Sequence, residues 1–265
     1  YLHSQNDILS SGGSVQTISV SQALPFSEGK IENFYMEYFM KGIKSESIKD
    51  DSIIVSGHSY QSKEPGITVT MNGDFEKQIS KNQGQENDLI YLSKPLGTGY
   101  LLAAYFNNSD FLSSIDFQNL LEWLKKGNSK ASEISKSFNS NITTDISGFG
   151  LGSHLSDICK SSKLSAEIKL NKEILINKNI EILENFKSTG FDNNYSSTVN
   201  EILISDSNKL KNILYDPQTN GPLLLSIHKK DQIEFEKKFQ LNLGFRPILL
   251  GKFKKSEDKL INVID

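Results

Sequence analysis

Residues 94–99 read KPLGTG and stand between a short apolar run at 89–92 and a helix-forming run that reaches Tyr105. This order predicts a buried strand, a glycine-containing turn and a helix. The start of a helix favours negative charge, so the turn could aim backbone amides at an anion. A purely structural strand-to-helix connection fits these residues equally well. The segment is not a Walker A loop, because no Gly-Lys-Ser or Gly-Lys-Thr ends it.

The residues upstream of this segment predict a leading helix followed by a β-α-β-β series. The leading helix stops at Gly12 and Gly13, and the second helix shows apolar residues at i, i+3 and i+4. The expected elements are a helix over 1–10, a strand over 15–24, a helix over 30–44, and strands over 52–55 and 66–73.

Downstream of the segment, helices and strands alternate. The expected elements are helices over 117–124, after residue 152, over 173–187 and over 229–240, and strands over 223–227 and 245–253. Alternation of this kind predicts a mixed α/β architecture. The polar stretch 76–88 is the best place for a domain boundary. We therefore expect an N-terminal domain over 1–88 and a C-terminal domain over 89–265.

Composition excludes several classes of protein. The chain has 265 residues, with 29 basic against 32 acidic residues and a net charge of -3. This balance gives no support for a nucleic-acid binder, which usually carries a basic face. No apolar run in the sequence approaches the roughly 18–20 residues that span a bilayer. The single cysteine, Cys159, cannot form an internal disulfide, which fits a reducing compartment and predicts a cytoplasmic location.

Two polar features of the N-terminal part are candidates for ligand binding. Ser56, Gly57, His58 and Ser59 follow an apolar run. A glycine there lets the backbone approach a ligand, and the hydroxyls and imidazole can donate to phosphate. A plain strand-to-loop turn is the favoured interpretation of this segment taken alone. Asp7, taken alone, is a surface carboxylate on a helix.

Two further turns carry carboxylates in the C-terminal part. In TDISGFG, residues 144–150, Asp145 precedes two glycines and could hold Mg²⁺ together with phosphates. It could equally cap the helix that follows. In DPQTNGP, residues 216–222, two prolines and a glycine predict a rigid turn before a strand. A purely structural role is favoured for that turn.

Taken together, these segments resemble one family, selenophosphate synthetase, also called selenide, water dikinase. The five corresponding motifs occur in the family's order between residues 6 and 222. They are NDILSSGG at 6–13, SGHS at 56–59, KPLGTG at 94–99, TDISGFG at 144–150 and DPQTNG at 216–221. Five motifs in one order make the resemblance highly specific.

The resemblance implies a fold, a reaction and roles for individual residues. The implied fold is α/β, aminoimidazole-ribonucleotide-synthetase-like, with a small N-terminal dimerisation domain, here truncated, and a larger C-terminal domain. In the implied reaction, ATP, selenide and water give selenophosphate, AMP and phosphate. Asp7 would be a Mg²⁺ ligand that also faces ATP, and Asp145 a second Mg²⁺ ligand. The segment from Ser56 to Ser59 would contact ATP phosphates, and the protein would be a homodimer.

The chain also departs from the family pattern. The family's cysteine or selenocysteine nucleophile, a nearby lysine and further aspartates would all lie before Tyr1. We therefore expect the catalytic nucleophile in an upstream part of a longer chain, such as a fusion behind an NADH-dehydrogenase-like flavoprotein, and no activity from these residues alone. Ser56 and Pro222 replace family residues, which keeps a second interpretation open. The chain could be a catalytically drifted nucleotide-binding or dimerisation module; another synthetase or kinase of the same fold is less favoured.

Overall fold

The structure of the chain is a computed structural model that describes residues 1–27, 29–76, 78–107 and 110–264. The chain forms two compact units, Tyr1–Gln78 (unit 1) and Ile79–Asp265 (unit 2). The division falls within the polar stretch 76–88, where the sequence suggests a boundary. The domain limits 1–88 and 89–265 themselves stay predictions.

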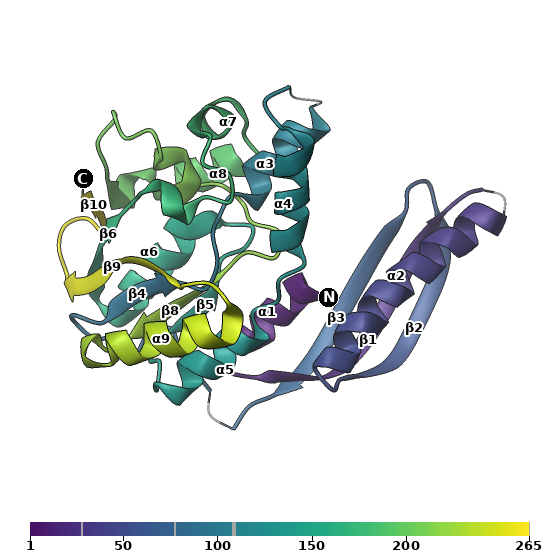
Figure 1. Ribbon diagram of the computed structural model, residues 1–265, viewed down its shortest axis with the longest axis horizontal. Coiled ribbons are helices and arrows are strands. Elements are labelled where there is room, and N and C mark those ends of the chain that lie inside the picture. The colour runs from purple at the N-terminus through teal and green to yellow at the C-terminus, as the bar shows by residue number, and fades with distance from the viewer. Residues whose placement is uncertain (28, 77, 108–109, 265) are drawn as a thin grey trace. The chain divides into compact units, whose positions relative to one another are not determined.

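Unit 1 is a three-stranded sheet with a long helix along it (Figure 1). The strand order is β2-β1-β3, with β1 and β2 parallel and β1 and β3 antiparallel. A parallel pair needs a crossover, which α2 provides. The elements are α1 (Leu2–Ser10), β1 (Ser14–Pro25), α2 (Gly29–Lys49), β2 (Ile53–Ser62) and β3 (Gly66–Asp74). The predicted leading helix and β-α-β-β series are confirmed.

The hydrophobic core of unit 1 is small. Among the residues that the structure describes, one buried cluster consists of Val15, Ile18, Val20 and Ile43, and Leu9 and Leu24 are also buried. The long helix α2 buries only Ile43 and Ser47 among its described residues. Because a small core supplies little stability, a unit of this kind usually depends on further contacts.

Unit 2 is built around a seven-stranded mixed sheet in the order β5-β8-β4-β9-β6-β10-β7 (Figure 1). The strands are β4 (Leu89–Leu92), β5 (Thr143–Asp145), β6 (Leu164–Lys169), β7 (Ile202–Leu203), β8 (Leu223–Ile227), β9 (Ile248–Lys255) and β10 (Ile261–Ile264). Every residue of β4 and β8 is buried. The predicted strands over 89–92 and 223–227 are confirmed, because a nearly continuous apolar run, broken here only by Ser226, signals a central strand.

Helices pack on this sheet. The α-helices are α3 (Thr98–Phe106), α4 (Ser114–Leu124), α5 (Ser129–Ser137), α6 (Gly150–Ser162), α7 (Ile180–Asn185), α8 (Phe191–Thr198) and α9 (Gln232–Leu243). Short 3₁₀ turns are η1 (Lys172–Ile174), η2 (Val199–Glu201), η3 (Lys211–Leu214) and η4 (Lys229–Asp231). The predicted continuous helix over 173–187 is wrong, since η1 and α7 are separate. No helix in the described ranges is long and apolar enough to cross a membrane.

Candidate functional site

Three of the sequence motifs meet at one end of the unit 2 sheet. β4 and β5 both run antiparallel to β8, which lies between them. The segments that follow β4 and β5 therefore lie beside the segment that precedes β8. These segments are KPLGTG at 94–99, TDISGFG at 144–150 and DPQTNGP at 216–222.

Gln218 joins the first and third of these segments. Its Oε1 accepts hydrogen bonds from the backbone N–H of Gly97 at 2.8 Å and of Thr98 at 3.2 Å. The Thr98 hydroxyl donates to the same oxygen at 3.2 Å and accepts from the N–H of Thr219 at 2.8 Å. Gln218 thus satisfies amides at the start of α3 that would otherwise lack partners.

Asp216 satisfies the next two amides of α3. Its buried carboxylate accepts hydrogen bonds from the backbone N–H groups of Gly99 and Tyr100. The Ser188 hydroxyl and the Gln218 Nε2 also donate to it, at 2.9 and 2.8 Å. Burial raises the pKa of the Asp216 carboxyl to about 7, and these donors oppose the rise.

These contacts decide between the two interpretations of KPLGTG. The amides of residues 97–100 bind Gln218 and Asp216, so they do not point at an external anion. A Cβ atom at Gly99 would overlap the Pro217 carbonyl oxygen and the Asp216 carboxylate. The glycine is therefore required for close packing. KPLGTG is a structural strand-to-helix connection.

Asp145 is the last residue of β5, where it pairs with Leu223 of β8 and is buried. The N–H of Ile146 donates to the Pro222 carbonyl at 2.9 Å. The expected alternative, Asp145 as a helix cap, is wrong. The N-cap of α6 is Phe149, with no capping side-chain hydrogen bond.

The turn after Asp145 is held on both sides at Ser147. The Ser147 carbonyl accepts from the Gln218 N–H at 3.0 Å, and its N–H donates to His154 Nε2 at 3.4 Å. Burial lowers the pKa of His154, and the charge of Asp145 partly opposes this shift. A neutral imidazole is needed for Nε2 to accept that hydrogen bond. Asn194 completes the support by donating to the Gly148 carbonyl at 2.9 Å.

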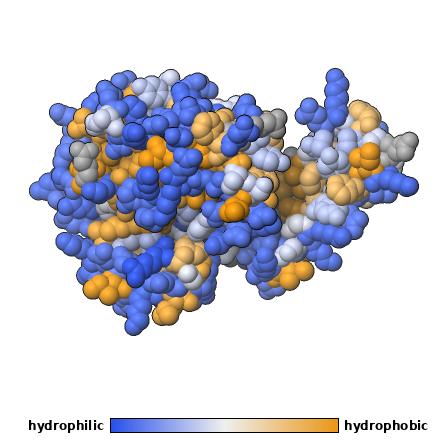
Figure 2. All heavy atoms as spheres, turned by 45° about the horizontal axis from the view of Figure 1, so that its top comes forward, coloured by the Kyte–Doolittle hydropathy of each residue, from blue (hydrophilic) through white to orange (hydrophobic). Residues whose placement is uncertain are grey.

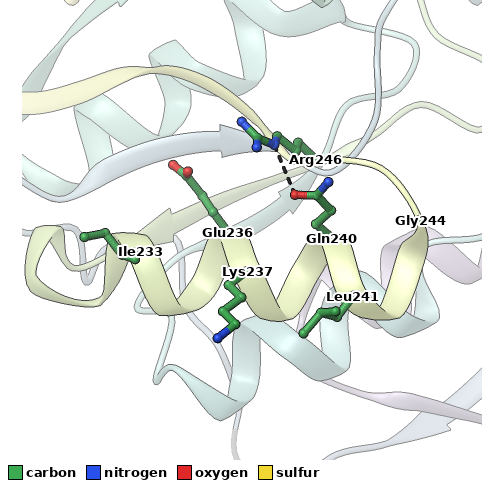
Figure 3. Close-up of a pocket in the computed structure, with 7 residues that line it drawn as sticks. All are labelled: Ile233, Glu236, Lys237, Gln240, Leu241, Gly244 and Arg246. Carbon is green, nitrogen blue, oxygen red and sulfur yellow. Dashed lines mark hydrogen bonds between the residues drawn. The ribbon is translucent and has the colours of Figure 1, made fainter.

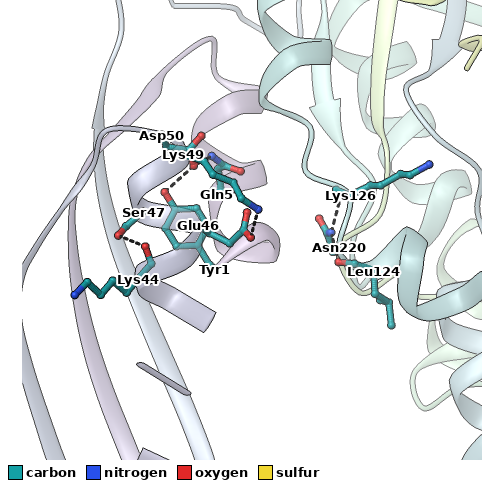
Figure 4. A network of polar contacts seen from close by, with 10 residues as sticks. All are labelled: Tyr1, Gln5, Lys44, Glu46, Ser47, Lys49, Asp50, Leu124, Lys126 and Asn220. Atoms are coloured by element: carbon teal, nitrogen blue, oxygen red, sulfur yellow. Dashed lines mark hydrogen bonds and ion pairs between the residues drawn. The ribbon is translucent and has the colours of Figure 1, made fainter. Parts of the chain in front are cut away.

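Lys94 and Asn220 form a polar cluster near the same segments. The Lys94 ammonium donates to the Lys126 carbonyl at 2.7 Å although its side chain is buried. The Asn220 side chain donates to the carbonyls of Leu124 at 2.7 Å and Lys126 at 3.1 Å (Figure 4). Burial, and next the charge of Lys126, lower the pKa of Lys94 to about 7.

The remaining candidate residues lie in unit 1. Asp7 is on the exposed face of α1, whose opposite face buries Gln5 and Leu9. The helix is anchored at its start, because the Tyr1 hydroxyl donates to Asp50 Oδ2 at 2.7 Å and Gln5 Nε2 donates to the same oxygen (Figure 4). The Asp7 carboxylate is therefore presented by a fixed helix.

The segment Ser56–Ser59 lies inside β2 and not in a turn. It continues the pairing with β1, from Ser56 opposite Ser19 to Ser59 opposite Gln22. The predicted strand-to-loop turn is wrong, because pairing with β1 overrides the weak strand preference of these residues. All four residues are exposed. A Cβ atom on Gly57 would meet only the Val20 carbonyl, at 3.4 Å, so packing does not require a glycine there.

The donor set suits a metal that takes few protein ligands. Among the residues that the structure describes, no three His, Cys, Asp or Glu side chains form a metal-binding group. Asp7 and Asp145 are single carboxylates in different units. Mg²⁺ is commonly held by one or two carboxylates together with phosphates and water, so each of these carboxylates, taken by itself, has the chemistry of an Mg²⁺ ligand.

A pocket elsewhere in unit 2 does not involve these motifs. It has a volume of about 590 Å³ and follows one side of α9 (Figure 3). Its lining residues are Ile233, Glu236, Lys237, Gln240, Leu241, Gly244 and Arg246. The candidate site is therefore defined by the motifs and their contacts rather than by this pocket.

Comparison with known proteins supplies the family. No family model matches the chain. The selenide, water dikinase of Campylobacter jejuni strain RM1221 is 30% identical over 228 residues, which cover 85% of this chain and 66% of that protein. The enzyme of Caldanaerobacter subterraneus subsp. tengcongensis is 28% identical over 211 residues, 78% of this chain and 61% of that protein. This chain is related to the selenide, water dikinases. It spans 61 to 66% of the length of these two relatives.

Solved structures show the fold. Thiamine monophosphate kinase from Aquifex aeolicus superposes with a TM-score of 0.67 at 17% identity, covering 98% of this chain and 77% of that one. The hydrogenase maturation protein HypE from E. coli superposes with a TM-score of 0.73 at 11% identity, covering 99% and 74%. This chain therefore has the expected aminoimidazole-ribonucleotide-synthetase-like fold.

Proposed function

We propose that this chain is the ATP-binding part of a selenide, water dikinase, the C-terminal portion of a longer enzyme that converts ATP, selenide and water into selenophosphate, AMP and phosphate. The observation that carries the proposal is the similarity to dikinases over 78 to 85% of the chain, which includes the segments that hold Asp145. Two structural neighbours add support, since one HypE structure contains ATP and one thiamine monophosphate kinase structure contains AMPPCP.

In this proposal the carboxylates position the nucleotide. Asp145 and Asp7 would hold Mg²⁺, which neutralises phosphate charge during transfer. The buried position of Asp145 strengthens its attraction for a cation, because little water screens it. Ser56, Gly57, His58 and Ser59 would contact the phosphates, and all four residues are exposed, so a ligand can approach them.

We further propose that the protein is a homodimer that associates through unit 1. The smaller body in Figure 2 shows hydrophobic residues at its surface. On β2, Ile53 is 65% exposed and Val55 is 57% exposed, in a unit with a small core. Phe26, Ile31, Phe34 and Ile67 of the same unit are exposed as well. Several exposed apolar side chains on one small unit are typical of an association surface. A cytoplasmic location stays a prediction from the cysteine content.

Calorimetric titration of Mg²⁺-ATP into the chain tests the proposed nucleotide site. We expect binding by the wild-type chain and none by Asp145→Asn, because the amide cannot neutralise the cation. Asp206→Asn is the matched control, since Asp206 is fully exposed and its ion pair with Lys211 spans 3.8 Å. Equal binding by Asp145→Asn and wild type would show that Asp145 does not belong to the nucleotide site. A wild-type chain that does not bind would favour the alternative, a catalytically drifted dimerisation module.

A further inference from the structure

Gln218 uses both polar groups of its side chain, Oε1 to reach residues 97–98 and Nε2 to brace its own turn. Its Oε1 accepts from Gly97 N, Thr98 N and the Thr98 hydroxyl. Its Nε2 donates to the carbonyl of Asp216 at 3.0 Å and to the carboxylate of the same residue at 2.8 Å. Only a primary amide offers an acceptor and two donors in this arrangement. Glutamate would lose the donors, and methionine would lose both.

The backbone of Gln218 reaches the turn that carries Asp145. Its N–H donates to the carbonyl of Ser147, two residues after Asp145. Close by, a Cβ atom at Gly221 would overlap the Ile146 carbonyl, so the two turns lie in direct contact. The course of the backbone just after Asp145 is therefore set by the turn that contains Gln218.

The side chain of Gln218 holds this turn, residues 216–222, in place. Without it, residues 216–222 would lose the three hydrogen bonds of Gln218 to Gly97 and Thr98, and only those of Asp216 and Thr219 would still tie the turn to the start of α3. A carboxylate ligand must be held within a fraction of an ångström to keep its affinity for a metal. Residues behind the ligands commonly change metal affinity by about 10- to 100-fold when they are mutated.

We propose that Gln218 is a positioning residue for Mg²⁺ binding: through its contacts with Thr98, Asp216 and Ser147 it fixes the turn of Asp145 without touching the metal or ATP. The inference rests on the proposed function, in which Asp145 is a metal ligand. It assigns to DPQTNGP a functional role in addition to its structural one.

The test measures ATP binding as a function of Mg²⁺ concentration, well below the melting temperature of each variant. Gln218→Met is expected to raise the half-saturating Mg²⁺ concentration about tenfold or more. Thr98→Val, which removes the hydroxyl bonded to Gln218, is expected to raise it several-fold. Thr98→Ser keeps that hydroxyl and is expected to restore the wild-type value. Gln240→Met is the matched control, because Gln240 is an exposed residue of α9.

The outcomes separate a positioning role from a merely structural one. A structural role lowers the melting temperature of Gln218→Met or Thr98→Val but leaves the Mg²⁺ dependence at the wild-type value, and this result overturns the proposal. If Gln218→Met does not fold, the comparison of Thr98→Val with Thr98→Ser decides. Wild-type chain that does not bind Mg²⁺-ATP, or Asp145→Asn that binds it normally, overturns the proposed function and this inference together. If Asp145→Asn abolishes Mg²⁺-ATP binding but the Thr98 and Gln218 variants keep the wild-type Mg²⁺ dependence, only the inference about Gln218 is overturned.

Discussion

Lys94 places an amine in the interior of unit 2, where it is 2% exposed and donates to the Lys126 carbonyl. Its pKa falls from an ordinary 10.5 to about 7, chiefly because burial disfavours the charge. An unfolded chain binds this proton up to pH 10.5, whereas the folded chain releases it near pH 7. Folding is therefore penalised as the pH falls from 10.5 towards 7, and the penalty is constant below 7.

Lys94→Met should remove this penalty with little change in volume. We expect the variant to be more stable than wild type at pH 7 by a few kcal/mol, on the order of the pKa shift converted to free energy. The difference should shrink as the pH rises towards 10. The Lys126 carbonyl keeps the hydrogen bond from Asn220, which limits the loss. Urea unfolding between pH 6.5 and 9.5 measures the difference, with exposed Lys237→Met as control. A stability difference between Lys94→Met and wild type that does not change with pH would show that the buried charge of Lys94 is not its cause.

Gly99 is a second residue whose identity the packing dictates. The overlap of an added Cβ with the Pro217 carbonyl involves backbone, which cannot rotate away as a side chain can. Gly99→Ala should therefore lower the free energy of unfolding by about 3 kcal/mol or more, at the upper end of overpacking costs. Gly148→Ala, which has open space around it, should leave stability nearly unchanged. Thermal unfolding of both variants checks this, and equal melting temperatures would refute it.

At the scale of elements, α4 begins with a complete capping box. The Ser113 hydroxyl accepts from the Asp116 N–H at 3.2 Å, while the Asp116 carboxylate accepts from the Ser113 N–H at 3.0 Å. Ser113→Ala should cost about 1 kcal/mol of stability, the usual value of an N-cap. Ser113→Thr, which keeps the hydroxyl that also donates to the Asp116 carboxylate at 2.6 Å, should cost less. Urea midpoints measure both, and a Ser113→Ala midpoint equal to wild type would show that the cap contributes nothing.

Elements were predictable from the sequence where burial is uniform along the chain. β4 and β8 were predicted to the residue because all their residues are buried and all but Ser226 are hydrophobic. The helix expected over 173–187 failed because Asn179 starts a new helix there, its side chain accepting from the Glu181 N–H at 3.1 Å. Asparagine competes with helical hydrogen bonding in this way.

The candidate site was predictable as a set of motifs but not as a set of contacts. Asp145 stands out in the sequence because it precedes glycines. The bond from Gly97 to Gln218 spans 121 residues, and no local pattern encodes it. The sequence could signal that DPQTNGP is a rigid turn. Only the folded sheet, which places β8 between β4 and β5, shows which amides and which turn it contacts.

At the scale of the whole molecule, the proposed homodimer follows from the imbalance within unit 1. The buried cluster of this unit is small, whereas apolar residues on β2 are strongly exposed. Val55→Lys places a charge on that strand, and burying it in an association surface would be costly. Sedimentation velocity should show a concentration-dependent dimer for wild type and a monomer-shifted equilibrium for Val55→Lys. Ile233→Lys is the control, since Ile233 is 84% exposed on α9 in the other unit. A monomeric wild type, or a dimer that both variants weaken equally, would show that the chain does not associate through β2 of unit 1.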